Sequence, residues 1–445
     1  MKRLIVLVTF VIVGAGHAQP PDTLWTYNFP DREVLAIKAT SDGGIVALKN
    51  SYSSGLVLKF DALGNIVWTH DFSGQSRYIQ TTRDGGFIVL ASDNGTKLVR
   101  MDSSGSTEWE RNYPYGSIAQ LMDFVSETQD GGFVVTGAPL SGRCMWRFNA
   151  NGDTLWHRNL WNPQCLVYNV IPSANEADGR IRLLDLLNQW ESPWGNYFQV
   201  QTWTYAGDSV TSRTYSDTTR ELEELDAEVT NTGNMVVAGL GEGFFPEGCA
   251  VFVARFNPQG DAVWSRGFYD NSPADGCGAL SVDVTSDGGC VAGGIGTDGE
   301  GGNWGLIVKI DSTGYQQWYL SSPLLTDGSI TDIVQTSDGG YAAVLSFTDN
   351  DGHYIRSRLF RFAPDTWASP NSARLTCTYI PETDRLRLNW SERQGAIEYR
   401  IYSGLVPGEA ETLEGTLPAG THSFELTPQS NWRFYLVTAE YSARQ

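Results

Sequence analysis

The chain has 445 residues, and its 51 Asp and Glu residues outnumber its 31 Lys and Arg residues, which gives a formal net charge of −20 at pH 7. A protein this acidic repels polyanions, so nucleic acids are excluded as partners. The 48 Gly, 15 Trp and 19 Tyr residues favour short β-strands joined by tight turns over helices.

Residues 1–18 have the composition of a secretory signal peptide. Lys2 and Arg3 precede an apolar stretch, and Gly16 and Ala18 provide small residues for cleavage. No later segment is apolar for long enough to cross a bilayer. We therefore expect an exported mature chain, secreted or periplasmic, without a transmembrane segment.

An Asp-Gly-Gly corner recurs between pairs of apolar runs, as in VQTSDGGYAAV at 334–344. A phosphate-binding loop would require a helix after the glycines, whereas a β-hairpin requires residues with positive φ, so we interpret the corner as a hairpin turn. Seven units precede residue 368 at intervals of about 42 to 55 residues, which is typical of four-stranded propeller blades. Complete corners begin at Asp42, Asp84, Asp130, Asp287 and Asp338, and degenerate copies lie at Asp178-Gly179 and Thr232-Gly233.

A second motif follows the corner in most units. It reads LKFDALGNIVW at 58–68 and VKIDSTGYQQW at 308–318, with similar copies at 99–109, 146–156 and 254–264. Each copy predicts a strand, a turn containing Gly, and a strand that carries Trp. The two motifs together predict four strands per blade, which we call A to D from the axis outwards.

The final unit ends at Trp367 without a fourth strand, and the missing strand is expected from the other end of the chain. Asp22-Thr23-Leu24-Trp25 repeats Asp153-Thr154-Leu155-Trp156 almost residue for residue. The predicted fold class is therefore all-β, with a seven-bladed β-propeller at 19–368 closed by the N-terminal strand and followed by a small β-sandwich.

The corners and the Asp-x-x-Gly-x-x-x-Trp turns resemble the repeats of secreted bacterial β-propeller proteins. They are also similar to the tryptophan-docking repeats of quinoprotein-type propellers. The resemblance covers residues 22–367 and implies a blade, not an activity. Quinoprotein dehydrogenases have adjacent cysteines and eight blades, and sialidase Asp-boxes place Gly and Trp three residues apart instead of four, so neither activity is implied.

Residues 371–445 follow a different pattern. Segments 385–390, 396–404, 421–427 and 433–441 alternate apolar and polar residues at a spacing typical of a sandwich. The tail resembles a fibronectin type III domain. That resemblance implies a module that spaces or presents other modules.

Strand A of each blade is expected to line the central channel, and it supplies the candidate catalytic residues. Counting back from the corner places Asp226, Glu228, Asp283 and Asp332 on the channel side of three consecutive blades. Close carboxylates raise one another's pKa for acid–base work or hold a cation. The alternative is that they form the polar lining of a watery channel.

Two pairs of cysteines occupy equivalent places in successive blades, where B–C and D–A loops meet. We predict disulfides Cys144–Cys165 and Cys249–Cys277 on this ground. Cys290 and Cys377 are expected to be buried thiols.

Aromatic residues gather in the loops of the same predicted face. The candidate ligand-binding residues are Trp161, Trp190, Trp194, Phe244, Phe245 and Trp304. Exposed aromatic rings stack on sugars or anchor protein partners. The alternative is that long loops fold back and bury these rings against the blades.

These observations predict a monomeric, exported, non-catalytic protein that recognises a glycan or an extracellular protein on the loop face of the propeller. Two alternatives remain open: a carbohydrate-active hydrolase or lyase that uses the channel acids, and a structural envelope protein without a discrete ligand. No metal-ligand spacing occurs among the histidines, and no cofactor is expected.

Overall fold

The computed structural model describes residues 20–30, 32–50, 54–114, 122–137, 144–160, 165–173, 179–189, 196–216, 222–230, 232–245, 248–268, 276–297, 302–348, 354–365, 376–380, 385–389, 396–404, 412–418, 420–421, 423–427 and 434–441. Within these residues the regular structure is entirely β-strand. The chain divides into two compact units, of which one is Pro20–Asp365 and the other contains the strands after Thr366.

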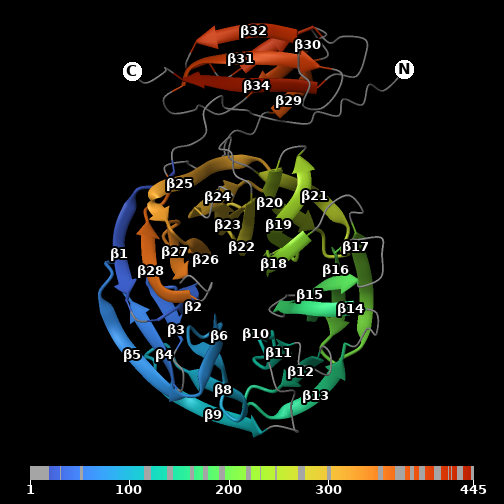
Figure 1. The fold of residues 1–445 in the computed structure, drawn as a ribbon. Helices are drawn as coiled ribbons and strands as arrows, with labels where there is room; N and C mark the ends of the chain where they lie inside the picture. Colours follow the sequence, from blue (N-terminus) through green and yellow to red (C-terminus); the bar gives the residue numbers. More distant parts are fainter. Residues whose placement is uncertain are drawn as a thin grey trace. The chain divides into compact units, whose positions relative to one another are not determined.

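The first unit is a ring of seven four-stranded blades in the described residues, which confirms the predicted propeller. The innermost strands β2, β6, β10, β18, β22 and β26 surround the axis, and β5, β9, β13 and β17 lie towards the rim (Figure 1). Blades 1 to 3 comprise β2 (Val34–Ala39), β3 (Ile45–Lys49), β4 (Ser54–Phe60) and β5 (Ile66–Ser73); β6 (Gln75–Thr81), β7 (Phe87–Ser92), β8 (Gly95–Met101) and β9 (Thr107–Pro114); and β10 (Phe124–Glu127), β11 (Phe133–Gly137), β12 (Cys144–Phe148) and β13 (Thr154–Asn159). Blades 4 to 6 comprise β14 (Cys165–Ser173), β15 (Arg180–Gln189), β16 (Asn196–Thr204) and β17 (Ser209–Ser216); β18 (Leu222–Val229), β19 (Met235–Phe245), β20 (Gly248–Phe256) and β21 (Ala262–Phe268); and β22 (Gly276–Val284), β23 (Cys290–Thr297), β24 (Asn303–Ile310) and β25 (Gln316–Thr326). Blade 7 comprises β26 (Ser329–Gln335), β27 (Tyr341–Thr348), β28 (Tyr354–Phe362) and β1 (Thr23–Phe29).

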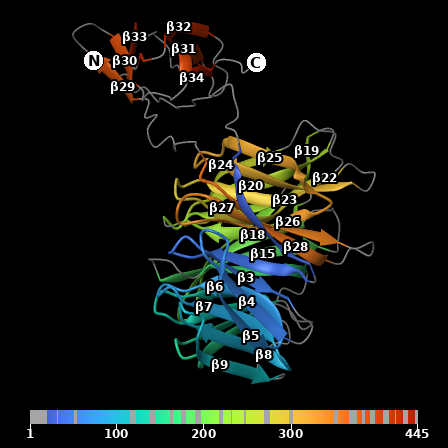
Figure 2. The ribbon, with the colours of Figure 1, turned by 90° about the vertical axis from the view of Figure 1, so that its left-hand side faces the viewer.

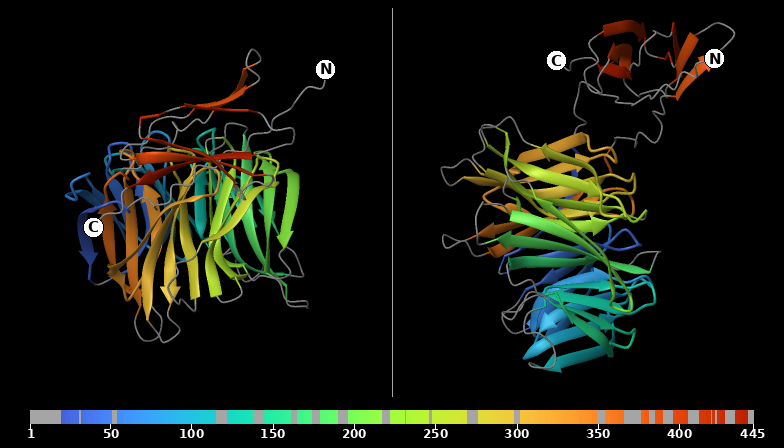
Figure 3. Two further views of the ribbon diagram at one scale, coloured as in Figure 1. Left: turned by 90° about the horizontal axis from the view of Figure 1, so that it is seen from above. Right: turned by 90° about the vertical axis from the view of Figure 1, so that its right-hand side faces the viewer.

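Seen from the side, this unit is a disc, and its strands run through the thickness of the disc (Figure 2 and Figure 3). Blades 5 and 6 are joined further, because Leu240 of β19 pairs with Gly278 of β22 and merges the two blades into one eight-stranded sheet.

The N-terminal strand closes the ring as predicted. Strand β1 runs antiparallel to β28, with a register from Thr23 opposite Phe362 to Phe29 opposite Ser357. The amide of Ala363 also donates to the carbonyl of Asp22 at 2.8 Å. The first described strand thus becomes the outer strand of the last blade, and it covers an edge of β28 that would otherwise be free to pair.

Apolar clusters fill the spaces between neighbouring blades and form the core. One cluster joins Ile37 and Phe60 of blade 1 to Val344 and Leu359 of blade 7, and each further cluster likewise combines residues of adjacent blades. The faces of the blades are buried in this way, so each blade depends on its two neighbours.

Tryptophans of the outermost strands hold the rim together, because each indole reaches the C–D turn of the next blade. The ring of Trp68 covers Gly105, where an added Cβ would lie 2.7 Å from it. Where the indole nitrogen finds an acceptor, the bonds are Trp25 Nε1 to Ala62 O at 3.0 Å, Trp109 Nε1 to Ala150 O at 3.1 Å, Trp156 Nε1 to Tyr205 O at 2.9 Å, Trp264 Nε1 to Ser312 O at 3.2 Å and Trp318 Nε1 to Asp365 Oδ2 at 2.9 Å.

The second unit contains two three-stranded sheets in the residues described. The strand orders are β29-β30-β33 and β32-β31-β34. The bounds are β29 (Thr376–Ile380), β30 (Arg385–Asn389), β31 (Ala396–Gly404), β32 (Thr412–Pro418), β33 (Ser423–Leu426) and β34 (Phe434–Tyr441).

We predict that deleting residues 19–30 destabilises the propeller. The deletion removes the buried Phe29 and the docked Trp25, so the free energy of unfolding falls by at least about 3 kcal/mol, the usual cost of losing one buried aromatic side chain. Thermal unfolding followed by circular dichroism measures the loss. Leu24→Ala is the matched control because Leu24 lies on the same strand and is 54% exposed; an unchanged transition in the truncated chain would contradict closure by β1.

Candidate functional site

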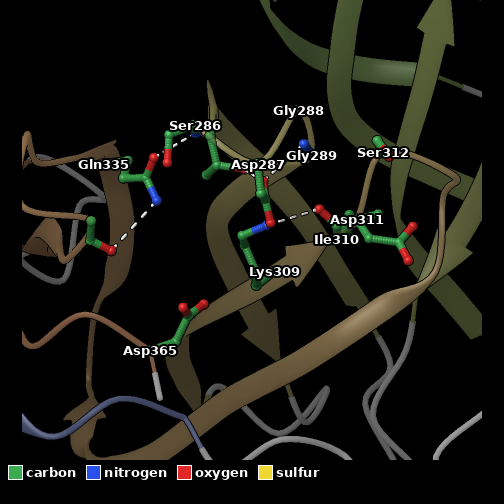
Figure 4. Close-up of polar contacts among 12 residues, drawn as sticks. Ser286, Asp287, Gly288, Gly289, Lys309, Ile310, Asp311, Ser312, Gln335 and Asp365 are labelled. Atoms are coloured by element: carbon green, nitrogen blue, oxygen red, sulfur yellow. Dashed lines mark hydrogen bonds and ion pairs between the residues drawn. The ribbon is translucent and has the colours of Figure 1, made fainter. Parts of the chain in front are cut away.

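The Asp-Gly-Gly corner is the first candidate site, and the structure shows that it is a lock within the blade. In five blades a buried Lys or Arg of strand C reaches the corner Asp. Figure 4 shows this arrangement in blade 6, where Lys309 Nζ lies 2.8 Å from Asp287 Oδ2 and also donates to the carbonyl of Ile310 at 3.2 Å. The other pairs are Lys59 with Asp42 at 2.8 Å, Arg147 with Asp130 at 2.5 Å, Arg361 with Asp338 at 2.6 Å, and Arg100 with Asp84.

The corner Asp also organises its own turn. In blade 1, Asp42 Oδ1 accepts from the hydroxyl of Thr40 at 2.5 Å and from the amide of Gly44 at 3.0 Å. Burial alone would raise the pKa of Asp42, but the bonds from Lys59, Thr40 and Gly44 lower it to about 2. The pKa of Asp84, Asp130, Asp287 and Asp338 is lowered by the same kind of contacts.

The two glycines of the corner have different roles. The first has positive φ, for example 84° at Gly43 and 80° at Gly288, as the turn requires. The second has no room for a side chain, since a Cβ on Gly44 would lie 2.1 Å from Lys59 Nζ and 2.2 Å from the carbonyl oxygen of Phe60. The absence of a side chain at the second glycine therefore leaves the space that the buried cation occupies.

Blades 4 and 5, which lack the second glycine, support this reading. In blade 5 Asn234 takes the place of Gly44, and Arg255 of strand C bonds instead to blade 6, with Nη1 2.7 Å from the carbonyl oxygen of Gly288. In blade 4 Arg180 takes that place, and Thr202 stands where other blades have the cation. A strand C cation that bonds to the corner of its own blade thus occurs together with Gly-Gly. In the two blades that lack the second glycine, the cation bonds elsewhere or is replaced.

The central channel is the second candidate site. A cavity of about 320 Å³ lies within the ring and is lined from blades 1, 2, 3, 5, 6 and 7. It brings together the four predicted carboxylates, Asp226, Glu228, Asp283 and Asp332, with Lys38 and Tyr78. The other face of strand A is apolar, and its residues Ile37, Ile79, Val125, Ala227, Val282 and Ile333 are buried.

Three of these carboxylates hold neighbouring blades together. The free edge of each innermost strand leaves amides without a ladder partner, and such buried amides need an acceptor. Asp226 Oδ2 accepts from the amide of Val282 at 2.9 Å, and Asp283 Oδ2 accepts from the amide of Gln335 at 2.6 Å. Asp332 Oδ2 accepts from the amide of Ile37 at 2.6 Å, which joins blade 7 to blade 1.

Glu228 differs, because the groups that act on it are the charges of Asp283, Lys38 and Asp332 and the amide of Val229 in its own strand. Burial and the nearby Asp283 raise the pKa of Glu228 to about 7. Burial also raises the pKa of Asp226 to about 7, that of Asp283 to about 6, and that of Asp332. Lys38 lies 5.0 Å from the Tyr78 ring centre; burial alone would lower its pKa, but Tyr78, Asp332 and Glu228 raise it well above its usual value, so Lys38 stays charged.

The predicted aromatic ligand-binding residues are only partly described. Trp304, on β24, is half-buried, and its indole packs on Gly296, where an added Cβ would meet the ring nitrogen at 2.6 Å. Phe244 and Phe245 lie at the end of β19, with their side chains outside the described residues. Trp161, Trp190 and Trp194 also fall outside them.

The predicted disulfide Cys144–Cys165 is not present in this structure. Cys144 is a buried free thiol, and its Sγ lies 3.7 Å from Sδ of Met122, within the core between blades 2 and 3. The side chains of Cys165 and Cys249 lie outside the described residues. Cys277 is buried and forms no disulfide, so the predicted disulfide Cys249–Cys277 is not present in this structure either. Cys290 is a buried free thiol, as expected.

The residues described contain no group of three or more His, Cys, Asp or Glu side chains placed to hold a metal ion. They also contain no helix long and apolar enough to span a membrane.

The strand C cation is a structural residue that was not predicted from the sequence. It stands two residues before the Asp or Asn of the second motif, in LKFD, VRMD, WRFN and VKID. Its regular recurrence beside apolar residues was a usable signal, since a charge repeated on a buried strand requires a fixed partner.

Comparison with known proteins supports the propeller. A family model described as "Outer membrane protein assembly factor BamB" matches residues 16–165, which is less than half of the chain. No curated protein matches. Among solved structures, BamB from Moraxella catarrhalis is 16% identical with a TM-score of 0.42, covering 83% of this chain and 97% of that chain.

Two further solved structures are also similar to this chain. A protein of unknown function from Bacteroides caccae is 15% identical with a TM-score of 0.39, covering 64% of this chain and 95% of that one. A catalytically inactive virginiamycin B lyase from Staphylococcus aureus, solved with quinupristin, is 9% identical with a TM-score of 0.47, covering 76% and 99%. Likeness at this level says nothing about a ligand or an activity of this chain.

Asp130→Asn tests the corner lock. The substitution keeps the shape of the turn and removes only the charge opposite Arg147, which is 1% exposed, so the free energy of unfolding falls by about 1–3 kcal/mol. Urea unfolding monitored by tryptophan fluorescence gives the value. Asp153→Asn is the control, because Asp153 is an exposed acid of the neighbouring turn; equal effects of the two substitutions would contradict the lock.

Glu228→Gln tests the channel charges. Groups whose folded pKa is raised from about 4 to about 6–7 stabilise the fold fully at low pH, and they lose that contribution as the pH rises through the folded pKa. The variant is therefore more stable than the parent by roughly 1–2 kcal/mol at pH 8, and the difference shrinks towards pH 5.

Melting temperatures between pH 5 and pH 8 measure this difference, with Asp71→Asn on the exposed outer strand β5 as the control. The depressed pKa of the corner Asp residues acts in the opposite sense, and its contribution is lost only below about pH 4. A variant that is less stable than the parent at pH 8 would show that the ionised Glu228 carboxylate is needed by the fold.

Proposed function

We propose that this chain is an exported, non-catalytic binding or scaffold protein, with a glycan or an extracellular protein as its ligand. The binding residues proposed are the loop aromatics Trp161, Trp190, Trp194, Phe244 and Phe245 at the B–C and D–A end of the strands. Trp304 becomes a weaker member of this set, since its ring is half-buried on Gly296.

The observation that carries the proposal is the use of the channel acids. The best candidates for acid–base chemistry in the sequence were four carboxylates, and three of them accept hydrogen bonds from the next blade. A carboxylate that satisfies a buried amide of the ring is engaged in stability, and removing it from that amide to react with a substrate costs the hydrogen bond.

The wider organisation is part of the same proposal. We propose that residues 1–18 are a signal peptide that directs export to the periplasm or the exterior, that residues 19–368 form the binding propeller, and that residues 371–445 are a fibronectin type III-like sandwich that spaces or presents it. The match of residues 16–165 to a family named for an outer membrane protein fits a location outside the cytoplasm.

A second candidate function rests on Glu228 and Asp283. Their pKa values are raised to about 7 and about 6, and both line the cavity of about 320 Å³. Carboxyl groups poised near neutral pH suit general acid–base catalysis, and the substrate class proposed is a carbohydrate, cleaved by a hydrolase or lyase reaction.

A glycan array with the mature protein, residues 19–445, separates these functions. Binding without turnover is expected, with at least a tenfold loss in affinity for Trp190→Ala or Trp194→Ala, the usual consequence of losing a stacked aromatic anchor. Leu63→Ala is the control, since Leu63 is 80% exposed and lies in a C–D turn at the opposite end of the strands.

A reducing-sugar assay on any glycan that binds gives the decisive readout. Release of reducing ends that is lost in Glu228→Gln would replace the binding proposal with the enzyme. No binding to any glycan, together with no protein partner recovered from envelope extracts, would leave the structural role.

A further inference from the structure

The seams between neighbouring blades differ in the directional bonds that the described residues make across them. Three positions of the repeat carry directional bonds across seams. The first is the strand D Trp, which docks on the C–D turn of the next blade. The second is the channel-side acid exemplified by Asp226 and Asp332. The third is the last residue of strand A, where Glu127 and Gln335 accept from the previous blade.

The third type of bond is seen at two seams. Glu127 Oε2 accepts from the amide of Arg83, which joins blade 3 to blade 2 at 2.8 Å. Gln335 Oε1 accepts from the amide of Ser286 at 2.7 Å, which joins blade 7 to blade 6 and is visible in Figure 4. Each of these acceptors satisfies a backbone amide in the A–B turn of the previous blade.

At the seam between blades 4 and 5, all three positions hold residues unable to make these bonds. Thr211 faces Thr202 across strands β17 and β16, where Trp68 faces Lys59 and Trp264 faces Arg255 in other blades. Ile171 faces Leu184 in the register in which Asp226 faces Ala238. Val229 faces Met235, where Gln335 faces Tyr341 in blade 7.

Apolar packing joins these two blades within the part of the seam that the structure describes. Leu184 and Val200 of blade 4 belong to one buried cluster with Val237, Phe252 and Phe256 of blade 5. Such packing is non-directional, so it holds the blades together without fixing their angle as firmly as an indole or a carboxylate bond does.

The flanking seam between blades 5 and 6 is held in several ways. It has the Trp264 bond to Ser312, the Asp226 bond to Val282 and the Arg255 bond to Gly288, and the two blades share one sheet. The closure of blade 7 on blade 1 has the Trp25 bond to Ala62 and the Asp332 bond to Ile37. The amide of Val34 also donates to Ser357 Oγ at 3.0 Å across this closure.

We propose that the ring parts reversibly at the seam between blades 4 and 5, and not where the two ends of the propeller chain meet. Strand β18 borders this seam and carries Asp226 and Glu228 into the channel. Parting at this seam therefore opens a lateral way into the cavity, with blades 5 to 7 and 1 moving as one body.

Hydrogen exchange of the full mature chain, followed by mass spectrometry, tests the proposal. Amides of β17 and β18 are expected to exchange at least tenfold faster than those of β1, β22 and β26, as local opening requires. Thr211→Trp restores the missing indole towards the C–D turn at Gly260, and it is expected to slow exchange in β17 and β18 about tenfold.

Ser212→Trp is the matched control, because Ser212 is the exposed neighbour of Thr211 on the same strand and its side chain points to the other face. Trp264→Thr is the reciprocal variant, which removes the indole from the seam between blades 5 and 6. Exchange in β21 and β22 is expected to become faster in this variant, but to stay slower than exchange in β17 and β18 of the parent. The reason is that the bonds of Asp226 and Arg255 across the seam between blades 5 and 6 remain.

Three results would overturn the proposal. The first is exchange in β1 and β26 as fast as in β17 and β18. The second is equal slowing by Thr211→Trp and Ser212→Trp. The third is faster exchange at the seam between blades 5 and 6 than at the seam between blades 4 and 5 in Trp264→Thr. This third result needs only the parent and Trp264→Thr, so it tests the proposal even if Thr211→Trp fails to fold.

Discussion

The pairing of a buried strand C cation with the corner Asp is the constraint on which the blade depends. Arg147, Lys309 and Arg361 are at most 1% exposed, and a charge so placed is tolerated only with a fixed counter-charge and further hydrogen bonds. The corner supplies the carboxylate, and the backbone supplies carbonyl oxygens. The cation in turn leaves no space for a side chain on the second glycine. This one ion pair therefore explains why three positions of the repeat hold Asp, Gly, and Lys or Arg.

The same logic extends from the blade to the ring. The innermost strand of a propeller has an unpaired edge, and its amides need acceptors that the blade itself does not supply. Asp226, Asp283 and Asp332 provide them across three successive seams. Burial raises their pKa values because it disfavours the charged form of the acid, and the hydrogen bonds from the amides offset this only in part. A perturbed acid in a channel is therefore poor evidence for catalysis by itself, and Glu228 is of interest because its neighbours are charges.

Much of the fold was predictable from the sequence because the blade is repeated. Seven corners gave the number of blades, and Asp22-Thr23-Leu24-Trp25 identified the closing strand by its likeness to 153–156. Position along strand A likewise placed Asp226 and Asp332 in the channel. Their partners were not predictable, since Val282 and Ile37 contribute backbone amides that any residue would offer. The prediction of a Cys144–Cys165 disulfide relied only on the equivalent places of two cysteine pairs in successive blades. Such places in the repeat do not reveal that the Cys144 side chain packs against Met122.

The pairing of β1 with β28 also dictates when the molecule is complete. Thr23 lies opposite Phe362, so almost the whole propeller sequence separates these two paired antiparallel strands. Six blades have all their strands in consecutive order and are able to form as the chain lengthens, but the seventh waits for the most distant pairing in the domain. Such a contact has the highest loop-closure cost in the molecule. The partner of the first strand therefore becomes available only after nearly 340 further residues have been made.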